Sequence, residues 1–138
     1  MIQLAKLSGF SPIIATASIK NAEAIKQLGA HAVIDRSLSE DEIIAKVKEI
    51  TDKPITYVYD SISSGTTQQL GTRILAPGGH LLIVLEPPQT GAVLPDGKFL
   101  HYILGLSWSP ENVELAPKVF GEWAEELLTL IKVRLLRI

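Results

Sequence analysis

The sequence contains no cysteine among its 138 residues. This absence excludes disulfide bonds, catalytic thiolates and cysteine-ligated zinc sites. Histidine is also scarce, since the chain has only His31, His80 and His101, and their spacing fits no metal-binding motif. We therefore interpret each histidine as a surface or strand-end residue, and we predict no metal site.

Long apolar runs and an excess of positive charge are missing as well. Runs such as Leu81–Leu85 are far too short to span a bilayer. No charged segment with a cleavage site begins the chain, so we predict a cytoplasmic protein. The formal charge of −2 and the lack of a basic stripe argue against nucleic acid as a partner. We expect neither a membrane nor a nucleic-acid partner.

Short apolar runs and helical patterns alternate along the chain. Strands bounded by helices are typical of βαβ units with a mostly parallel sheet. Because such crossovers are right-handed, the predicted fold class is α/β, with a doubly wound, Rossmann-like sheet. The predicted strands are Pro12–Ala17, Ala32–Asp35, Thr56–Ile62, His80–Leu85 and Lys98–Gly105.

One helix has a particularly clear beginning. Ser39 stands three residues before Glu42, which is the spacing of a capping box. Ile43, Val47 and Ile50 then repeat at helical intervals, so we predict that all three are buried. The other predicted helices cover Met1–Gly9, Ala22–Leu28, Thr66–Leu75 and Glu111–Ile131.

Five short segments of the chain form a specific pattern through their order and spacing. They are Ile2-Gln-Leu-Ala-Lys-Leu-Ser-Gly9, Ile14-Ala-Thr-Ala-Ser18, Leu28-Gly-Ala-His-Ala-Val-Ile-Asp35, Tyr57-Val-Tyr-Asp60 and Leu75-Ala-Pro-Gly-Gly79. Together they resemble the nucleotide-binding domain of medium-chain dehydrogenases/reductases. The most similar branch is the zinc-independent one, which holds quinone oxidoreductases and fungal trans-acting enoyl reductases.

The chain also departs from this family. The glycine-rich fingerprint G-x-G-x-x-G and the strand before it are absent, and so is the family's catalytic domain. We therefore predict that residues 1–138 form a partial Rossmann-like domain. In the strand order 3-2-1-4-5-6 the missing first strand is central. The strands on either side of it, Pro12–Ala17 and Thr56–Ile62, would then pair directly, recruit a strand from another copy, or leave the domain partly molten. We expect a homo-oligomer.

The end of the predicted strand Pro12–Ala17, the second in the family's order, indicates which cofactor the domain would prefer. In NAD enzymes an acidic residue at this place binds the adenosine ribose and repels a 2′-phosphate. Here Ser18, Lys20 and Asn21 follow the strand and no carboxylate does. The resemblance implies a Ser-x-x-Asn contact with the 2′-phosphate, and therefore NADP(H). The alternative is that Ser18 or Asn21 merely caps a helix.

Arg36 follows the predicted strand Ala32–Asp35, the third in the family's order, and has two possible roles. Its guanidinium could bind the same phosphate or stack on adenine. It could equally form a surface ion pair with Asp35 or Glu40.

Three further residues are candidates from the ends of later strands. Ser61 lies at the end of the predicted strand Thr56–Ile62, the fourth in the family's order, whose carboxyl end faces the cofactor crevice in this fold. The resemblance places Leu85 and Glu86 near the nicotinamide, largely through their backbone groups. For Glu86 the alternative is an exposed loop carboxylate.

The resemblance implies that the chain is the NADP(H)-binding portion of an enoyl or quinone reductase. We assign no catalytic residue, and we expect weak or lost cofactor binding and doubtful catalysis by the chain alone. The alternative is a non-catalytic dimerisation or interaction module that uses the same fold.

Overall fold

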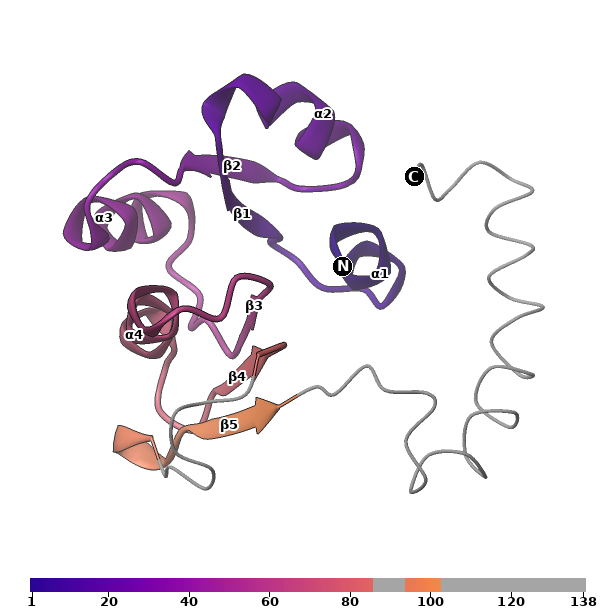
Figure 1. The fold of residues 1–138 in the computed structure, drawn as a ribbon. Helices are drawn as coiled ribbons and strands as arrows, with labels where there is room; N and C mark the ends of the chain where they lie inside the picture. The colour runs from indigo at the N-terminus through magenta and orange to yellow at the C-terminus, as the bar shows by residue number, and fades with distance from the viewer. Residues whose placement is uncertain (86–93, 103–138) are drawn as a thin grey trace. The chain divides into compact units, whose positions relative to one another are not determined.

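The computed structural model describes residues 1–85 and 94–102 (Figure 1). The described residues belong to two compact units, residues 1–38 and residues 39–85 with 94–102. Three predictions lie outside the described residues: Glu86, the end of the last strand at 103–105, and the helix at 111–131.

The first unit contains one pair of parallel strands and the helices that flank it in sequence. β1 pairs with β2 from Ile14 opposite Ala32 to Ala17 opposite Asp35. The predicted bounds of the second of these strands are confirmed, whereas β1 begins two residues later than predicted. The elements are α1 (Ile2–Leu7), β1 (Ile14–Ala17), the 3-10 helix η1 (Ile19–Asn21), α2 (Ala22–Gln27) and β2 (Ala32–Asp35).

A glycine lets α1 approach the turn between α2 and β2. Gly29 has a φ of 119°, in the region that favours glycine. A Cβ atom at this position would lie 2.6 Å from Cδ of Lys6 on α1. Ala30 and Ile34 beside this turn are buried, together with Ile13. The glycine of the Leu28–Asp35 segment is therefore needed both for the turn and for the packing.

The second unit is a three-stranded parallel sheet with two helices. β4 is the middle strand, and its residues His80–Ile83 pair with Tyr57–Asp60 on one side and Phe99–Tyr102 on the other. The elements are α3 (Glu40–Ile50), β3 (Tyr57–Asp60), α4 (Gly65–Ile74), β4 (His80–Ile83), the 3-10 helix η2 (Pro95–Gly97) and β5 (Phe99–Tyr102).

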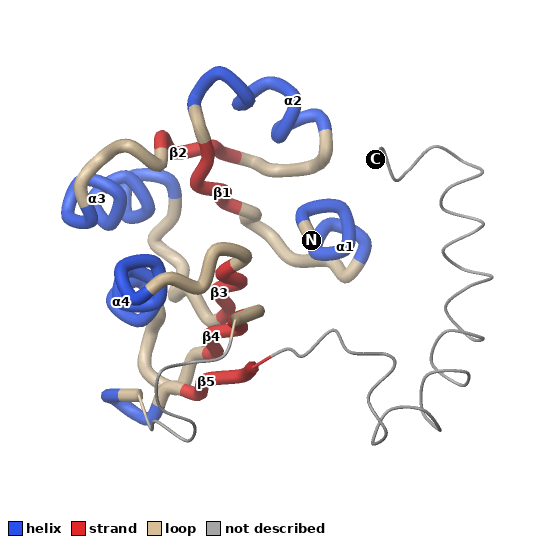
Figure 2. Tube along the Cα trace, viewed as in Figure 1, coloured by secondary structure: helices blue, strands red, loops and turns tan. Residues whose placement is uncertain are grey.

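The core of this unit lies between α4 and the sheet, and Figure 2 shows α4 beside the three strands. Leu81 and Ile83 are fully buried at its centre with Leu75. Gly71 lets the helix approach closely, because a Cβ there would lie 2.9 Å from Leu81 and 3.2 Å from Val58. The close contact ties the helix to the middle of the sheet.

The beginning of α3 confirms the predicted capping box. The Glu42 amide donates to Ser39 Oγ, and both the amide and the hydroxyl of Ser39 donate to Glu42 Oε2. Ile43 and Val47 are buried as predicted, but Ile50 is 37 % exposed, so that prediction is wrong. Ile50 is the last helical residue, and the chain turns to an extended conformation at Thr51.

This cap predicts a pH-dependent contribution to stability. Hydrogen bonds from Ser39, its hydroxyl first, lower the pKa of Glu42. Because the folded pKa is below the unfolded value, the stabilisation is present above the unfolded pKa and is lost as pH falls through the folded one. We expect Ser39→Ala to raise the pKa of Glu42 toward its ordinary value, measured by carboxyl 13C NMR.

An internal control accompanies this measurement. The amide of Ser37 lowers the pKa of Asp35, and this hydrogen bond does not involve Ser39. The pKa of Asp35 should therefore stay lowered in Ser39→Ala. An unchanged pKa of Glu42 in that variant would refute the capping account.

The strands confirm the predicted parallel α/β class and show where the sheet is divided. The described strands form two separate sheets, ordered β1-β2 and β3-β4-β5. These correspond to the 3-2 and 4-5-6 portions of the predicted strand order. Direct pairing of β1 with β3 is not among the ladders of residues 1–85 and 94–102.

Candidate functional site

The carboxyl edge of the β1-β2 pair brings two predicted segments together. The Arg36 amide donates to the carbonyl of Ala17 at 3.0 Å, directly beyond the last strand pair. Ser18 therefore leaves β1 beside the point at which Arg36 leaves β2. η1 follows Ser18 at once and contacts β2. The edge places Ser18, Lys20, Asn21 and Arg36 on adjacent turns.

The polar side chains of this edge are not used to cap helices. Ser18 stands at the N-cap of η1 and Asn21 at the N-cap of α2, yet neither side chain forms a capping hydrogen bond. The capping alternative is therefore wrong for both side chains. Lys20 is exposed and forms no ion pair with another residue in the described part of the chain.

Arg36 is exposed, and the carboxylates considered as its partners bind elsewhere. Asp35 Oδ1 accepts from the Ser37 amide at 2.9 Å, while Glu40 Oε2 accepts from Arg73 at 2.8 Å. Within residues 1–85 and 94–102, no carboxylate forms an ion pair with Arg36. The charge of Arg36 acts on the neighbouring Asp35 only as the last of several influences on its pKa, after the Ser37 hydrogen bonds that lower it. Lys20 and Arg36 therefore stand at this edge without a close ion pair to a described carboxylate.

The carboxyl edge of the β3-β4-β5 sheet contains a polar clamp that the sequence analysis missed. Asp60 Oδ1 accepts from the amides of Ile62 and Ser63 at 3.0 and 2.9 Å. Ser63 Oγ donates to the Asp60 carbonyl at 2.8 Å and accepts from the Val84 amide at 2.9 Å. Asp60 and Ser63 are both buried. The clamp therefore ties the end of β3 to the segment after β4.

The clamp fixes the backbone on either side of two predicted site residues. Ser61 is exposed between the clamped residues, and Leu85, which follows Val84, is 57 % exposed. Asp60 Oδ2 is buried and has no hydrogen-bond partner in the described part of the chain. Asp60 and Ser63 thus position this edge, and the Asp-x-x-Ser spacing at a strand end was the sequence signal for them.

Removing the Ser63 hydroxyl is expected to destabilise the second unit. Ser63→Ala leaves the Val84 amide without its acceptor, and an unsatisfied buried group costs about 1–3 kcal/mol. Urea unfolding measures this loss, and the exposed Ser61 supplies the control Ser61→Ala, with an expected change near zero. Equal stability of the two variants would contradict the clamp.

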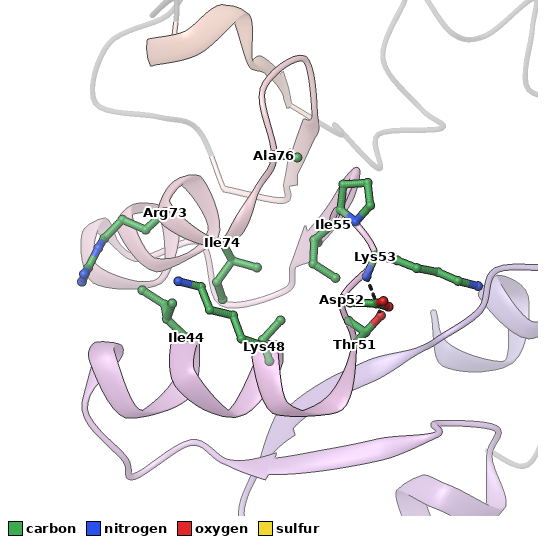
Figure 3. Close-up of a pocket in the computed structure, with 11 residues that line it drawn as sticks. Ile44, Lys48, Thr51, Asp52, Lys53, Ile55, Arg73, Ile74 and Ala76 are labelled. Carbon is green, nitrogen blue, oxygen red and sulfur yellow. Dashed lines mark hydrogen bonds between the residues drawn. The ribbon is translucent and has the colours of Figure 1, made fainter.

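A separate hollow of about 290 Å³ lies between the end of α3 and the end of α4 (Figure 3). Its lining mixes apolar and polar side chains, and none of the described residues predicted for the site contributes to it. Figure 3 shows Lys53 and Arg73 extending away from it in opposite directions. Arg73 is engaged with Glu40 and Asp41 on α3. We assign no ligand to this hollow.

Comparison with known proteins identifies the family. The family described as zinc-binding dehydrogenase matches residues 1–102. The chain belongs to that family. It lies in the medium-chain dehydrogenase/reductase superfamily, on the enoyl reductase branch. The resemblance found in the sequence is thereby confirmed.

Individual relatives agree with this placement. The trans-enoyl reductase fsa3 of Fusarium sp. (strain FN080326) is 32 % identical over 150 aligned positions, covering 99 % of this chain and 41 % of the relative. The quinone oxidoreductase of Pseudomonas syringae pv. Tomato DC3000 is 25 % identical, with a TM-score of 0.72 over 99 % of this chain and 42 % of that one.

One solved structure is itself a nucleotide-binding portion. The nucleotide-binding subdomain of the enoylreductase domain of PpsC from Mycobacterium tuberculosis has a TM-score of 0.67 and 24 % identity. The match covers 99 % of this chain and 76 % of that subdomain. At this identity the likeness shows the fold, which is Rossmann-like α/β. The chain spans only part of the length of its curated relatives, 41 % of the Fusarium trans-enoyl reductase fsa3.

Two features are absent from the residues that the structure describes. No helix in residues 1–85 and 94–102 is long and apolar enough to cross a membrane. The same residues hold no group of three or more His, Cys, Asp or Glu side chains placed to bind a metal ion.

Proposed function

We propose that this chain is the NADP(H)-binding portion of an oxidoreductase of the enoyl or quinone reductase type. Its role is to bind the adenosine half of the cofactor, with the 2′-phosphate at the carboxyl edge of β1 and β2. The family membership supports an oxidoreductase with a nucleotide cofactor. The choice of NADP(H) over NAD(H) rests on the residues at that edge.

The observation that carries the proposal is the pair of cations at this edge. Lys20 and Arg36 follow the two neighbouring strands, and neither forms an ion pair with a described carboxylate. Ser18 and Asn21 add a hydroxyl and an amide that are not spent on caps. A phosphate dianion accepts charge-assisted hydrogen bonds from groups of this kind, and Arg binds it in a bidentate manner. No carboxylate follows β1 in the segment from Ser18 to Asn21, and the carboxylate of Asp35 on β2 accepts from the Ser37 amide.

Adenosine phosphates test where the phosphate binds. We expect 2′,5′-ADP, added to 15N-labelled protein, to shift the amides of Ser18, Lys20, Asn21 and Arg36. The matched probe 5′-ADP lacks the 2′-phosphate and should shift them much less. Equal shifts with both probes, or shifts confined to other residues, would overturn the proposed phosphate position.

Ser61, Leu85 and Glu86 complete the proposed cofactor contacts. The clamp supports this role for Ser61 and Leu85 because it fixes the backbone around both. Glu86 lies outside the described residues. The cytoplasmic location, zinc independence and homo-oligomeric state remain predictions.

We further propose that the chain alone does not turn over enoyl or quinone substrates. The sequence holds no glycine-rich fingerprint, whose amides bind the pyrophosphate, and no side chain that we assign as a proton donor. Purified chain mixed with NADPH and a quinone or enoyl thioester should show no substrate-dependent loss of absorbance at the NADPH band. Steady oxidation that purifies with the chain would contradict this statement.

A further inference from the structure

One face of the β3-β4-β5 sheet carries rings instead of an aliphatic core. Strand register places Tyr57, His80 and Phe99 in one row across the sheet, and His101 lies two residues further along β5, opposite Leu82. Tyr57 and Phe99 are 52 % and 53 % exposed, and His101 is exposed as well. The opposite face holds the buried core residue Leu81. Two of the three histidines therefore meet on the open face.

His80 is held between two aromatic rings. Its ring centroid lies 5.1 Å from that of Tyr57 and 5.0 Å from that of Phe99, with interplanar angles of 14° and 17°. The two stacking contacts fix the plane of the imidazole. Its Nδ1 then lies 2.8 Å from Nε2 of His101, and one of the two nitrogens donates to the other.

We propose that His80 Nδ1 and His101 Nε2 form a two-ligand site for a divalent transition-metal ion of the Cu2+ and Ni2+ type. Imidazole nitrogen is a preferred ligand for these ions, and Cu2+ binds such donors most tightly in the first-row series. Water molecules fill the remaining positions. The proposal is independent of nucleotide binding and of any site in the relatives.

The distance between the nitrogens decides which coordination geometry fits. Two ligands about 2.0 Å from a metal and at a right angle to each other lie about 2.8 Å apart, whereas a tetrahedral pair lies about 3.3 Å apart. The observed 2.8 Å matches the right-angled pair of square-planar Cu2+ and octahedral Ni2+. These ions therefore need no separation of β4 from β5.

Binding requires a small rearrangement of the pair. The proton shared by Nδ1 and Nε2 must leave the space between them, and it moves through solvent to the remote nitrogen of the same ring. At least one ring must also turn so that both lone pairs meet at the metal. His101 is the exposed ring, while His80 stays in its stack.

Charge and ligand count set the character of the site. No third His, Cys, Asp or Glu in the described part of the chain joins the pair, so the bound ion keeps exchangeable water positions. A site without carboxylates also does not suit Mg2+ or Ca2+, which prefer oxygen ligands. We expect one equivalent of Cu2+ with two imidazole nitrogens, and no binding of Mg2+.

The test combines Cu2+ titration of the full chain with electron paramagnetic resonance. Wild-type protein should bind one equivalent, with hyperfine splitting from two imidazoles. His80→Asn and His101→Gln should each weaken binding beyond the ~10–100-fold that outer-shell changes typically cost, since each removes a direct ligand. Ni2+ titrated by calorimetry should follow the same order.

A matched control separates this site from a general effect of histidine. His31 Nδ1 already accepts from the Ile13 amide at 2.9 Å, and Asn supplies an equivalent acceptor. His31→Asn should bind Cu2+ as wild type does. If His80→Asn fails to fold, His101→Gln decides, since that residue lies outside the stack of Tyr57 and Phe99. Binding that survives His101→Gln unchanged, or a signal from one imidazole only, would overturn the proposal.

Discussion

Replacing both Lys20 and Arg36 by Glu is expected to abolish the preference for 2′-phosphorylated nucleotides. Neither cation forms a close ion pair with a described carboxylate, and a hydrogen bond to a charged group contributes about 1.5–3 kcal/mol. Losing one such bond therefore lowers affinity by about tenfold to a hundredfold. The introduced carboxylates also repel the phosphate, so the double variant should bind 5′-ADP at least as well as 2′,5′-ADP.

Two other lysines supply a control with the same change in net charge. Lys48 and Lys53 are exposed in the second unit and form no ion pair with a described residue. Lys48→Glu with Lys53→Glu should leave the preference for 2′,5′-ADP unchanged. A preference that survives in the Lys20 and Arg36 double variant would show that the phosphate binds elsewhere.

Truncating Leu81 is expected to cause the largest loss of stability. This side chain is 0 % exposed at the centre of the β3-β4-β5 sheet, and its methyl groups contact the glycine face of α4. Leu→Ala changes at such positions typically cost 2–5 kcal/mol because a cavity remains. Urea unfolding of Leu81→Ala should show a loss in this range. Leu82→Ala, on the opposite face and only partly buried, should lose less.

The Leu81→Ala experiment also reports on how the second unit is built. If α4 and the sheet share one core, the loss appears as a shift of the whole unfolding transition of that unit. A loss below about 1 kcal/mol would mean that Leu81 is not packed as described.

The sequence predicted those elements well that depend on contacts between residues close together in the chain. The strand Ala32–Asp35 has the predicted bounds, and Ser39 with Glu42 forms the predicted capping box. Both depend on contacts within a few residues. The strand before Ser61 ends two residues earlier than predicted, because Asp60 Oδ1 accepts from the amides of Ile62 and Ser63 and turns the chain.

The contacts that the sequence did not predict join residues far apart in the chain. His80 and His101 are 21 positions apart, as are Ser63 and Val84. Such contacts depend on which residues of neighbouring parallel strands stand opposite each other, and spacing along one strand does not specify this register. For the same reason the histidines seemed scattered, although the structure brings two of them into hydrogen-bond contact.

The candidate site also contains residues that the sequence predicted and contacts that it did not. Ser18, Lys20, Asn21 and Arg36 were predicted because each follows the end of a strand, where parallel strands share one edge. The sequence left open whether Ser18 and Asn21 cap helices and whether Arg36 pairs with Asp35 or Glu40. In the structure neither Ser18 nor Asn21 forms a capping hydrogen bond. Arg36 forms no close ion pair with Asp35 or Glu40, whose hydrogen bonds go to Ser37 and Arg73. The role of Asp60 and Ser63 was not predicted, although their Asp-x-x-Ser spacing at a strand end was a local signal for it.

The ratio of NADPH to NADH affinity measures whether the carboxyl edge of β1 and β2 binds the 2′-phosphate. Both cofactors are titrated into the purified chain under the same buffer and salt, because phosphate contacts are sensitive to ionic strength. Binding is followed at the amides of Lys20 and Arg36, so that weak affinity still gives a measurable shift. We expect tighter binding of NADPH than of NADH, and we expect this preference to fall as the salt concentration is raised. Equal affinity, or tighter binding of NADH, would contradict it.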